Sequence, residues 1–122
     1  MAIEETTRDT MLDSIPTTVY LALSVGDLGN GGGGTECSGT GYARIAVTLS
    51  ASSGAARTNS SGPHVFTVGA GGWQAAVDYA AIYSASSGGT LLATDALTST
   101  RDMSAEGTTM TFAAGDLDLA LS

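Results

Sequence analysis

Two apolar runs separated by a glycine-rich connection constrain the fold of this chain more than any other feature. Residues 19–25 read VYLALSV and residues 42–47 read YARIAV, while GDLGNGGGGTECSGTG lies between them. Runs rich in β-branched and aromatic residues, bounded by turn residues, are typical of strands, whereas repeated glycine disfavours a helix. We therefore expect two core strands that flank a surface loop whose backbone reaches water or a partner.

The rest of the chain repeats this pattern of short apolar segments and polar turns. Residues 73–84, WQAAVDYAAIYS, would suit a helix because of their alanines, but their aromatic and branched residues recur at period two, which favours a strand. The polar segment 50–62 is either a long turn or a short edge segment. The expected strands are residues 17–25, 42–49, 63–68, 73–84, 90–98, 108–112 and 116–121, with a further one beginning within 102–104.

The N-terminal segment, residues 1–15, is the one helical candidate. Thr6 or Thr7 would cap its N-terminus, and Pro16 would end it. A terminal helix this short is marginal in water unless it packs against something. It is therefore either a helix lying on the body or an arm that reaches a neighbouring chain. Its narrow apolar stripe comprises Met11, Leu12 and Ile15.

The spacing of the expected strands indicates an all-β protein. Many short strands separated by glycine-rich turns are typical of an antiparallel sandwich or jelly roll. A chain of 122 residues is long enough for one such domain with a sizeable core. We expect a single antiparallel β-sandwich or jelly-roll-like domain over residues 17–122, preceded by the short helix or arm over residues 1–16.

The charge balance is one-sided, with twelve acidic residues against four basic ones and a net charge of −8. All four cations are arginines, and the chain has no lysine. Such a chain repels a phosphate backbone, so we expect no direct binding to nucleic acid. The surplus of acid either keeps the protein soluble or forms a face that docks on a basic partner.

Cysteine usage and hydropathy bear on the compartment. Cys37 is the only cysteine, which excludes an intramolecular disulfide. No signal peptide pattern starts the sequence, and no apolar run approaches the length of a membrane span. We therefore expect synthesis in a cytoplasm and no membrane partner.

No motif in the chain predicts catalysis or cofactor binding. A phosphate-binding loop needs a helix after its glycines or a gripping lysine, but a strand-like sequence follows here and lysine is absent. Asp27, Asn30 and Glu36 offer oxygen ligands, yet the spacing of a calcium-binding EF-hand is missing. His64, the only histidine, has no triad context, and too few zinc ligands are present. We expect no catalytic residues, no cofactor, no metal and no enzyme activity.

Protein contact is the remaining use for the unusual side chains. Aromatic residues anchor buried patches between proteins, so Trp73, Tyr79 and Tyr83 are candidates, with ordinary core packing as the alternative for each. The full set of candidate protein-contact residues is Met11, Leu12, Ile15, Asp27, Asn30, Glu36, Trp73, Tyr79 and Tyr83.

Three segments carry a resemblance to a known group of proteins. They are GYAR at residues 41–44, YAAIYSASSGGTLL at residues 79–92 and FAAGDLDLAL at residues 112–121. From Thr18 onward the chain resembles small tailed-bacteriophage virion proteins, described either as tail-fibre proteins or as head decoration (cement) proteins. Residues 1–15 and the glycine count at residues 31–34 depart from the pattern.

The resemblance implies a structural virion part. As a decoration protein it would be a β-sandwich on the outer surface of the phage head, made in the host cytoplasm, that clamps neighbouring major capsid subunits. It would act as a homo-oligomer, a dimer or a trimer, with residues 1–15 and 29–41 contacting neighbours. The alternative is a tail-fibre or receptor-binding module, in which the glycine loop and residues 50–62 form a recognition surface.

Overall fold

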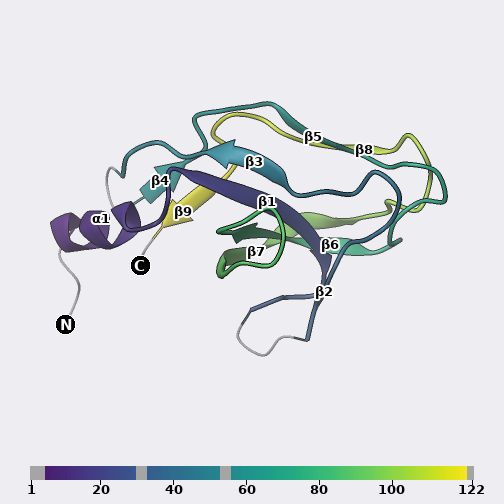
Figure 1. Ribbon diagram of the computed structural model, residues 1–122, viewed down its shortest axis with the longest axis horizontal. Helices are drawn as coiled ribbons and strands as arrows, with labels where there is room; N and C mark the ends of the chain where they lie inside the picture. The colour runs from purple at the N-terminus through teal and green to yellow at the C-terminus, as the bar shows by residue number, and fades with distance from the viewer. Residues whose placement is uncertain (1–4, 30–32, 53–55, 121–122) are drawn as a thin grey trace.

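The computed structural model describes residues 5–29, 33–52 and 56–120. These residues form one helix and nine strands (Figure 1). The elements are α1 (Glu5–Asp13), β1 (Thr18–Val25), β2 (Thr35–Glu36), β3 (Ile45–Thr48), β4 (Ala56–Thr58), β5 (His64–Thr67), β6 (Val77–Tyr83), β7 (Leu91–Arg101), β8 (Thr109–Phe112) and β9 (Asp118–Ala120).

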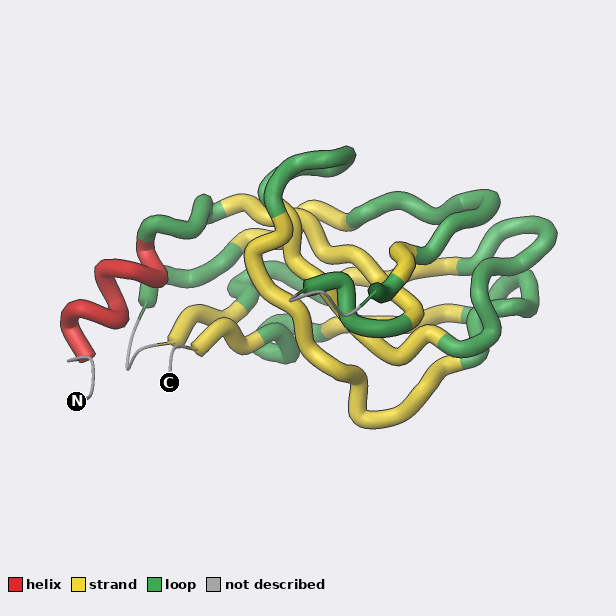
Figure 2. The backbone as a smooth tube through the Cα atoms, turned by 90° about the horizontal axis from the view of Figure 1, so that it is seen from below, coloured by secondary structure: helices red, strands yellow, loops and turns green. Residues whose placement is uncertain are grey.

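The strands form a two-layer antiparallel sandwich. One layer is a five-stranded sheet in the order β2-β1-β6-β7, with β3 also paired to β1. The other layer consists of two ribbons, β5–β8 and β4–β9. All the pairings are antiparallel, and α1 lies at one end of the body beside β4 (Figures 1 and 2). The expected antiparallel β-sandwich is confirmed, and the N-terminal segment, expected as a short helix or an arm, contains the helix α1.

The two apolar runs that flank the glycine loop pair with each other, as expected. β1 and β3 are antiparallel, with Val19 opposite Val47. Val19, Leu21 and Leu23 have no exposed surface, so this face of β1 belongs to the core. Ser24, on the opposite face, is equally buried because the connection between β1 and β3 folds back over that side of the sheet.

An aromatic cluster fills the space between the layers. Phe66 of β5 lies at its centre, 6.2 Å from the ring centroids of both Tyr42 and Phe112 and 6.4 Å from that of Trp73. Trp73 and Phe112 meet the Phe66 ring edge-to-face, whereas Tyr42 is stacked on it. Such ring pairs add to the free energy of burial. Trp73 is 7% exposed, and its Nε1 donates to the Thr40 carbonyl at 2.8 Å, which satisfies the one polar atom of the indole.

A buried asparagine ties the β4–β9 ribbon to the turn after β8. Asn59 is 2% exposed. Its Nδ2 donates to the carbonyls of Ser61 and Ala113, each at 2.9 Å. Its Oδ1 accepts the backbone N–H of Gly115 at 3.0 Å and of Leu117 at 2.9 Å. All four hydrogen-bonding positions of the amide are filled, which is what its burial requires.

Several element bounds differ from those expected. β6 begins at Val77 rather than at residue 73, and β7 continues to Arg101. The helix begins no later than Glu5, so Thr6 and Thr7 lie inside it and do not cap it. β2 and β4 were not predicted as separate strands, although a short edge segment within residues 50–62 was one alternative.

The environment of Cys37 predicts an unreactive thiol. The side chain is 3% exposed, and its burial, with a smaller effect from Glu36, raises its pKa from 9.0 to about 11. The thiolate is the reactive form. We expect labelling by Ellman's reagent at pH 8 to be about a hundredfold slower in the native protein than in urea, since two units of pKa change the thiolate fraction by that factor. Equal rates would show that the thiol opens readily to solvent.

Candidate functional site

The helix α1 is attached to the sandwich through its last turn. Leu12 is 3% exposed and belongs to the main core cluster, and Ile15 packs against that cluster. Arg57 of β4, 4% exposed, donates from Nη1 to the carbonyls of Leu12 at 2.9 Å and Ile15 at 2.6 Å, and from Nε to that of Ser50 at 2.8 Å. The last carbonyls of a helix lack partners inside the helix and favour a cation. Arg57 therefore supplies hydrogen-bond donors to carbonyls at the C-terminal end of α1 and just after it.

The loop before β4 adds a second attachment. The Ser52 N–H donates to the Asp13 carboxylate at 3.1 Å, and the Ser52 hydroxyl donates to the Asp9 carbonyl at 3.1 Å. The opposite side of the helix is open, since Thr7 and Thr10 are exposed. The last turn of α1 is therefore attached to the sandwich of the same chain, while the side of the helix that contains Thr7 and Thr10 is exposed.

A second arginine links several segments of the chain on the outer face of the five-stranded sheet. Arg44, whose side chain is 9% exposed, binds both carboxylate oxygens of Glu36: Nε to Oε2 at 2.9 Å and Nη2 to Oε1 at 2.8 Å. Its Nη1 donates to the carbonyls of Ala85 at 2.9 Å and Gly88 at 2.8 Å, in the turn between β6 and β7. The guanidinium carbon also lies 3.7 Å from the ring centroid of Tyr83. This geometry joins a bidentate ion pair to a cation–π contact.

Tyr42 connects this ion pair to the core. Its hydroxyl donates to Glu36 Oε2 at 2.7 Å and accepts the N–H of Leu23 at 3.1 Å, while its ring lies 5.2 Å from that of Trp73. Burial raises the pKa of the Tyr42 hydroxyl, and the hydrogen bond to Glu36 adds to this effect. We call Glu36, Tyr42, Arg44 and Tyr83 the Arg44 cluster.

The Arg44 cluster predicts a loss of stability in acid. The hydrogen bonds from Arg44, followed by that from Tyr42, hold the pKa of Glu36 below its ordinary value of 4.5 despite partial burial. Because the folded pKa is the lower one, the carboxylate stabilises the fold above pH 4.5, and this contribution is lost as the pH falls through the folded pKa. We expect the urea midpoint to fall less between pH 6 and pH 3 in Glu36→Gln than in the wild type; equal falls would contradict the assignment.

The start of the glycine loop is folded onto the same face. The Gly34 N–H donates to the Asp27 carbonyl at 2.9 Å, and Asp27 Oδ1 accepts from the Gly29 N–H at 2.8 Å and from the Thr94 hydroxyl at 2.9 Å. A Cβ at Gly34 would lie 2.5 Å from the Gly26 carbonyl oxygen, so this crossing needs glycine. Residues 26–29 of the loop are thus bonded to Gly34 and to Thr94 of β7.

The candidate contact residues fall into three groups. Leu12, Ile15 and Trp73 pack in or against the core of their own chain. Asp27, Glu36, Tyr79 and Tyr83 lie on or over the outer face of the five-stranded sheet; Tyr79 and Tyr83 are half-buried on β6 opposite Ser24 and Tyr20. Asn30 and the side chain of Met11 lie outside the described residues. Of the second group, Glu36 and Tyr83 both contact Arg44. Contact of this group with another protein remains a prediction.

Sequence reasoning gave no role to Arg44 and Arg57. Both hold several chain segments together, and both are among only four cations in an acidic chain. The small number of cations was the one sequence signal for these residues. An arginine flanked by apolar residues in a strand must either face water or find several hydrogen-bond acceptors. Which acceptors it finds depends on tertiary structure.

One serine and histidine pair resembles part of a catalytic arrangement. Ser61 Oγ lies 3.0 Å from His64 Nε2, and the same Oγ accepts the Thr48 N–H at 3.0 Å. A triad also needs a third group that orients the histidine, and among the described residues no hydrogen bond to its other ring nitrogen is seen. The described part of the chain brings no group of three histidine, cysteine or acidic side chains together around a metal position.

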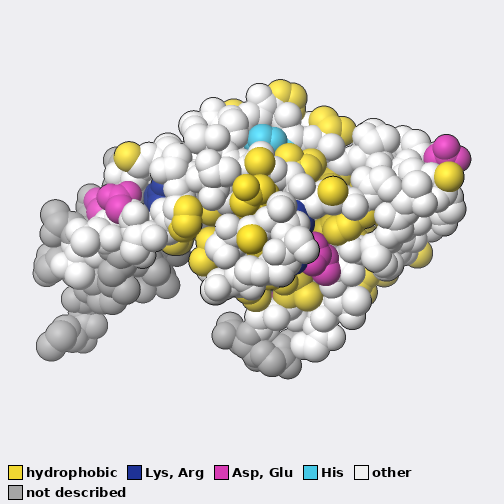
Figure 3. Space-filling model, viewed as in Figure 1, with side chains coloured by type: hydrophobic (Ala, Val, Ile, Leu, Met, Phe, Trp, Pro, Cys, Tyr) yellow, Lys and Arg dark blue, Asp and Glu magenta, His cyan; other side chains and the backbone are white. Residues whose placement is uncertain are grey.

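The surface of the molecule is sparsely charged on the face shown in Figure 3. Acidic side chains occur there in separate small groups and do not form one patch, and apolar atoms show between them.

Val65 on β5, 45% exposed, is the one large apolar residue that is largely exposed among those described. None of the described helical structure has the length and apolar character of a membrane-crossing helix.

Comparison with protein families gives a match over nearly the whole chain. The model of a protein family described as "Podophage GP4 fiber I protein gp80" matches residues 2–120. No curated protein and no solved structure matches the chain. The family match covers the helix, the Arg44 cluster and both layers of the sandwich.

Proposed function

The chain belongs to the family of the podophage GP4 fiber I protein gp80, and on that premise we propose that this structural protein of a phage virion is a subunit of a fibre on the phage tail. The observation that carries the proposal is the family match, which spans residues 2–120. Its role is structural: it binds other virion proteins, and it performs no catalysis.

Two structural features support this role. The core extends from Leu12 at the end of α1 to Met110 of β8, so helix and sandwich are packed as one unit. Arg44 and Arg57 each hold segments distant in sequence, which suits a part that must keep its shape within a particle. We further propose that the chain forms a dimer or trimer of identical copies in which the exposed side of α1 meets a neighbour.

Decoration of the head is the competing assignment. It rests on the resemblance of three segments to small phage virion proteins that are described either as tail-fibre or as decoration proteins, and it would make the major capsid protein the partner. In that case the chain would lie on the outer surface of the shell, as a clamp between capsid subunits. Both assignments place the chain in the virion, and they differ in its location and its copy number there.

Copy number separates them. We expect quantitative mass spectrometry of purified virions, with isotope-labelled standards for this chain and for the major capsid protein, to find far fewer copies of this chain than of the capsid protein. Tail fibres are few per particle, whereas a decoration protein follows the copy number of the shell. A ratio close to that of the capsid protein would contradict the fibre assignment.

A further inference from the structure

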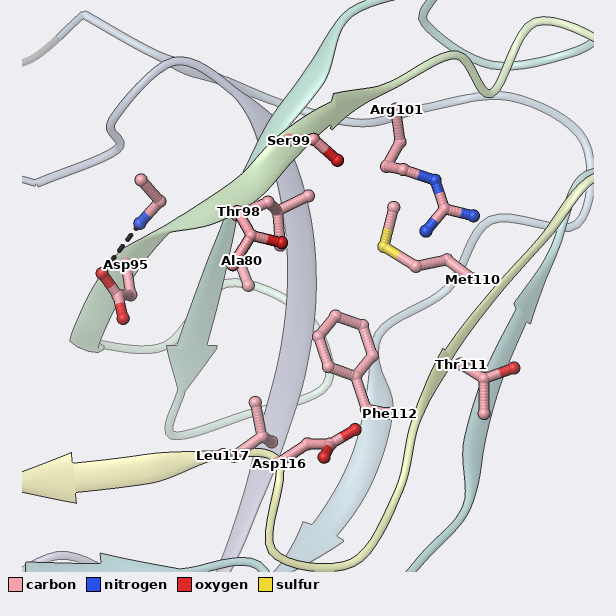
Figure 4. A pocket seen from close by; sticks show the side chains of 12 residues that line it. Ala80, Asp95, Thr98, Ser99, Arg101, Met110, Thr111, Phe112, Asp116 and Leu117 are labelled. Carbon is pink, nitrogen blue, oxygen red and sulfur yellow. Dashed lines mark hydrogen bonds between the residues drawn. The ribbon is translucent and has the colours of Figure 1, made fainter.

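The open edge of the sandwich between β7 and β8 contains a pocket. Its volume is about 470 Å³, within the range of small-molecule sites. β7 is the last strand of its sheet, and β8 pairs only with β5 among the described strands, so no strand bridges the layers here. In Figure 4, β7 passes on one side of the pocket and β8 with the following turn on the other.

An irregularity in β7 shapes one wall of this pocket. Tyr79 pairs with Ala96 and Val77 pairs with Arg101, so a single residue of β6 lies opposite residues 97–100 of β7. The excess residues form a bulge. Bulges re-aim side chains and are frequent beside functional sites. Here the bulge supplies Leu97, Thr98 and Ser99 to the pocket wall.

The pocket combines an apolar floor with polar groups around it. Met110 and Phe112 of β8 stand in the middle (Figure 4), where Met110 is 3% exposed and Phe112 is half-buried. The hydroxyls of Thr98 and Ser99 lie beside them on the β7 wall (Figure 4). An apolar surface with a few placed polar groups is typical of a ligand site.

Two carboxylates give the pocket its hydrogen-bonding character. Asp95 Oδ1 accepts the Ala96 N–H at 2.9 Å, and Asp116 Oδ2 accepts the Ala113 N–H at 2.7 Å. Each carboxylate thus uses one oxygen to fix its orientation, and in the described part of the chain the second oxygen has no hydrogen bond to protein. Ionised carboxylates only accept hydrogen bonds, so they favour a ligand with several hydroxyl groups.

We propose that this pocket binds a neutral saccharide of one or two rings. A sugar ring presents hydroxyls around its edge and C–H groups on its faces, which fits carboxylate and hydroxyl groups around an apolar floor. An anionic ligand is disfavoured because Asp95 and Asp116 outweigh Arg101 in the pocket and the chain carries a net charge of −8. An added peptide strand is disfavoured because the bulge and the charged residues interrupt the edge of β7.

The site is a property of this chain, and it does not depend on where in the virion the chain is placed. The test is NMR titration of the full-length ¹⁵N-labelled chain with glucose, galactose, mannose, rhamnose, N-acetylglucosamine, lactose, maltose and cellobiose. We expect at least one of these sugars to shift the amide signals of residues 95–101 and 110–117 in a saturable way, and galacturonic acid to bind more weakly than galactose.

Three variants decide whether the shifts report this pocket. Asp95→Asn removes a carboxylate at an exposed position, and Ser99→Trp fills the pocket; we expect each to weaken binding at least about tenfold. Glu106→Gln removes an acidic charge from the exposed turn before β8 and should leave the affinity unchanged. The proposal fails if no sugar shifts these signals, if Asp95→Asn and Ser99→Trp bind as the wild type does, or if galacturonic acid binds as tightly as galactose.

Discussion

Arg44→Ala is expected to lower the free energy of unfolding by about 3 kcal/mol, since removing one partner of a largely buried, hydrogen-bonded ion pair leaves the other charge uncompensated. Glu36 is the charge left behind, with its side chain 25% exposed. The substitution also leaves the carbonyls of Ala85 and Gly88 without their donor and removes the cation from the face of Tyr83. The turn between β6 and β7 should therefore exchange its amide hydrogens faster. Urea unfolding and hydrogen exchange measure both effects.

Arg101→Ala is the matched control for this substitution. Arg101 is exposed and donates one hydrogen bond, from Nη2 to the Thr109 carbonyl at 3.1 Å. An exposed residue with one such contact should cost no more than about 0.5–1 kcal/mol. If Arg44→Ala cost no more than Arg101→Ala, the Arg44 cluster would not be holding the outer face of the sheet.

Arg57→Ala should cost about 2–4 kcal/mol, because the carbonyls of Ile15 and Ser50 each lose a donor at about 1–2 kcal/mol. The carbonyl of Leu12 keeps the N–H of Ile15. Two of these carbonyls, those of Leu12 and Ile15, belong to the last turn of α1 and the residues after it. We expect the helix to detach before the sandwich unfolds, which would appear as faster amide exchange over residues 9–15. The ribbon β5–β8 lies away from Arg57 and should keep its protection.

The control for α1 is a substitution on its exposed side. Thr7→Ala changes an exposed residue of the helix and should alter the unfolding free energy by less than about 0.5 kcal/mol. If Arg57→Ala left exchange over residues 9–15 unchanged, Arg57 would not be the attachment of the helix, and the packing of Leu12 would have to hold it alone.

The strands with clear period-two patterns were predictable from the sequence. β1 and β3 were expected as flanks of the glycine loop, and β6, despite its alanines, followed its aromatic and branched residues. β2 and β4 are two and three residues long, too short to show a period of their own. They exist because β1 and β9 supply partners, which only the tertiary structure reveals.

The functional surfaces were less predictable. Trp73 could serve the core or an interface, and the structure places it in the aromatic cluster of its own chain. Glu36 was singled out as a candidate protein-contact residue, yet it is paired with Arg44, eight residues further along. The pocket at β7 and β8 depends on a bulge and on two unpaired strand edges, neither of which has a sequence pattern that single-chain reasoning can recognise.

The location of the chain on the virion tests the central claim most directly. We expect an antibody raised against the folded chain, coupled to gold and viewed by electron microscopy, to label intact virions at the tail fibres. Isolated tails should bind the same antibody and empty heads should not. Gold spread over the surface of the head, with unlabelled tails, would contradict the fibre assignment and favour a decoration protein.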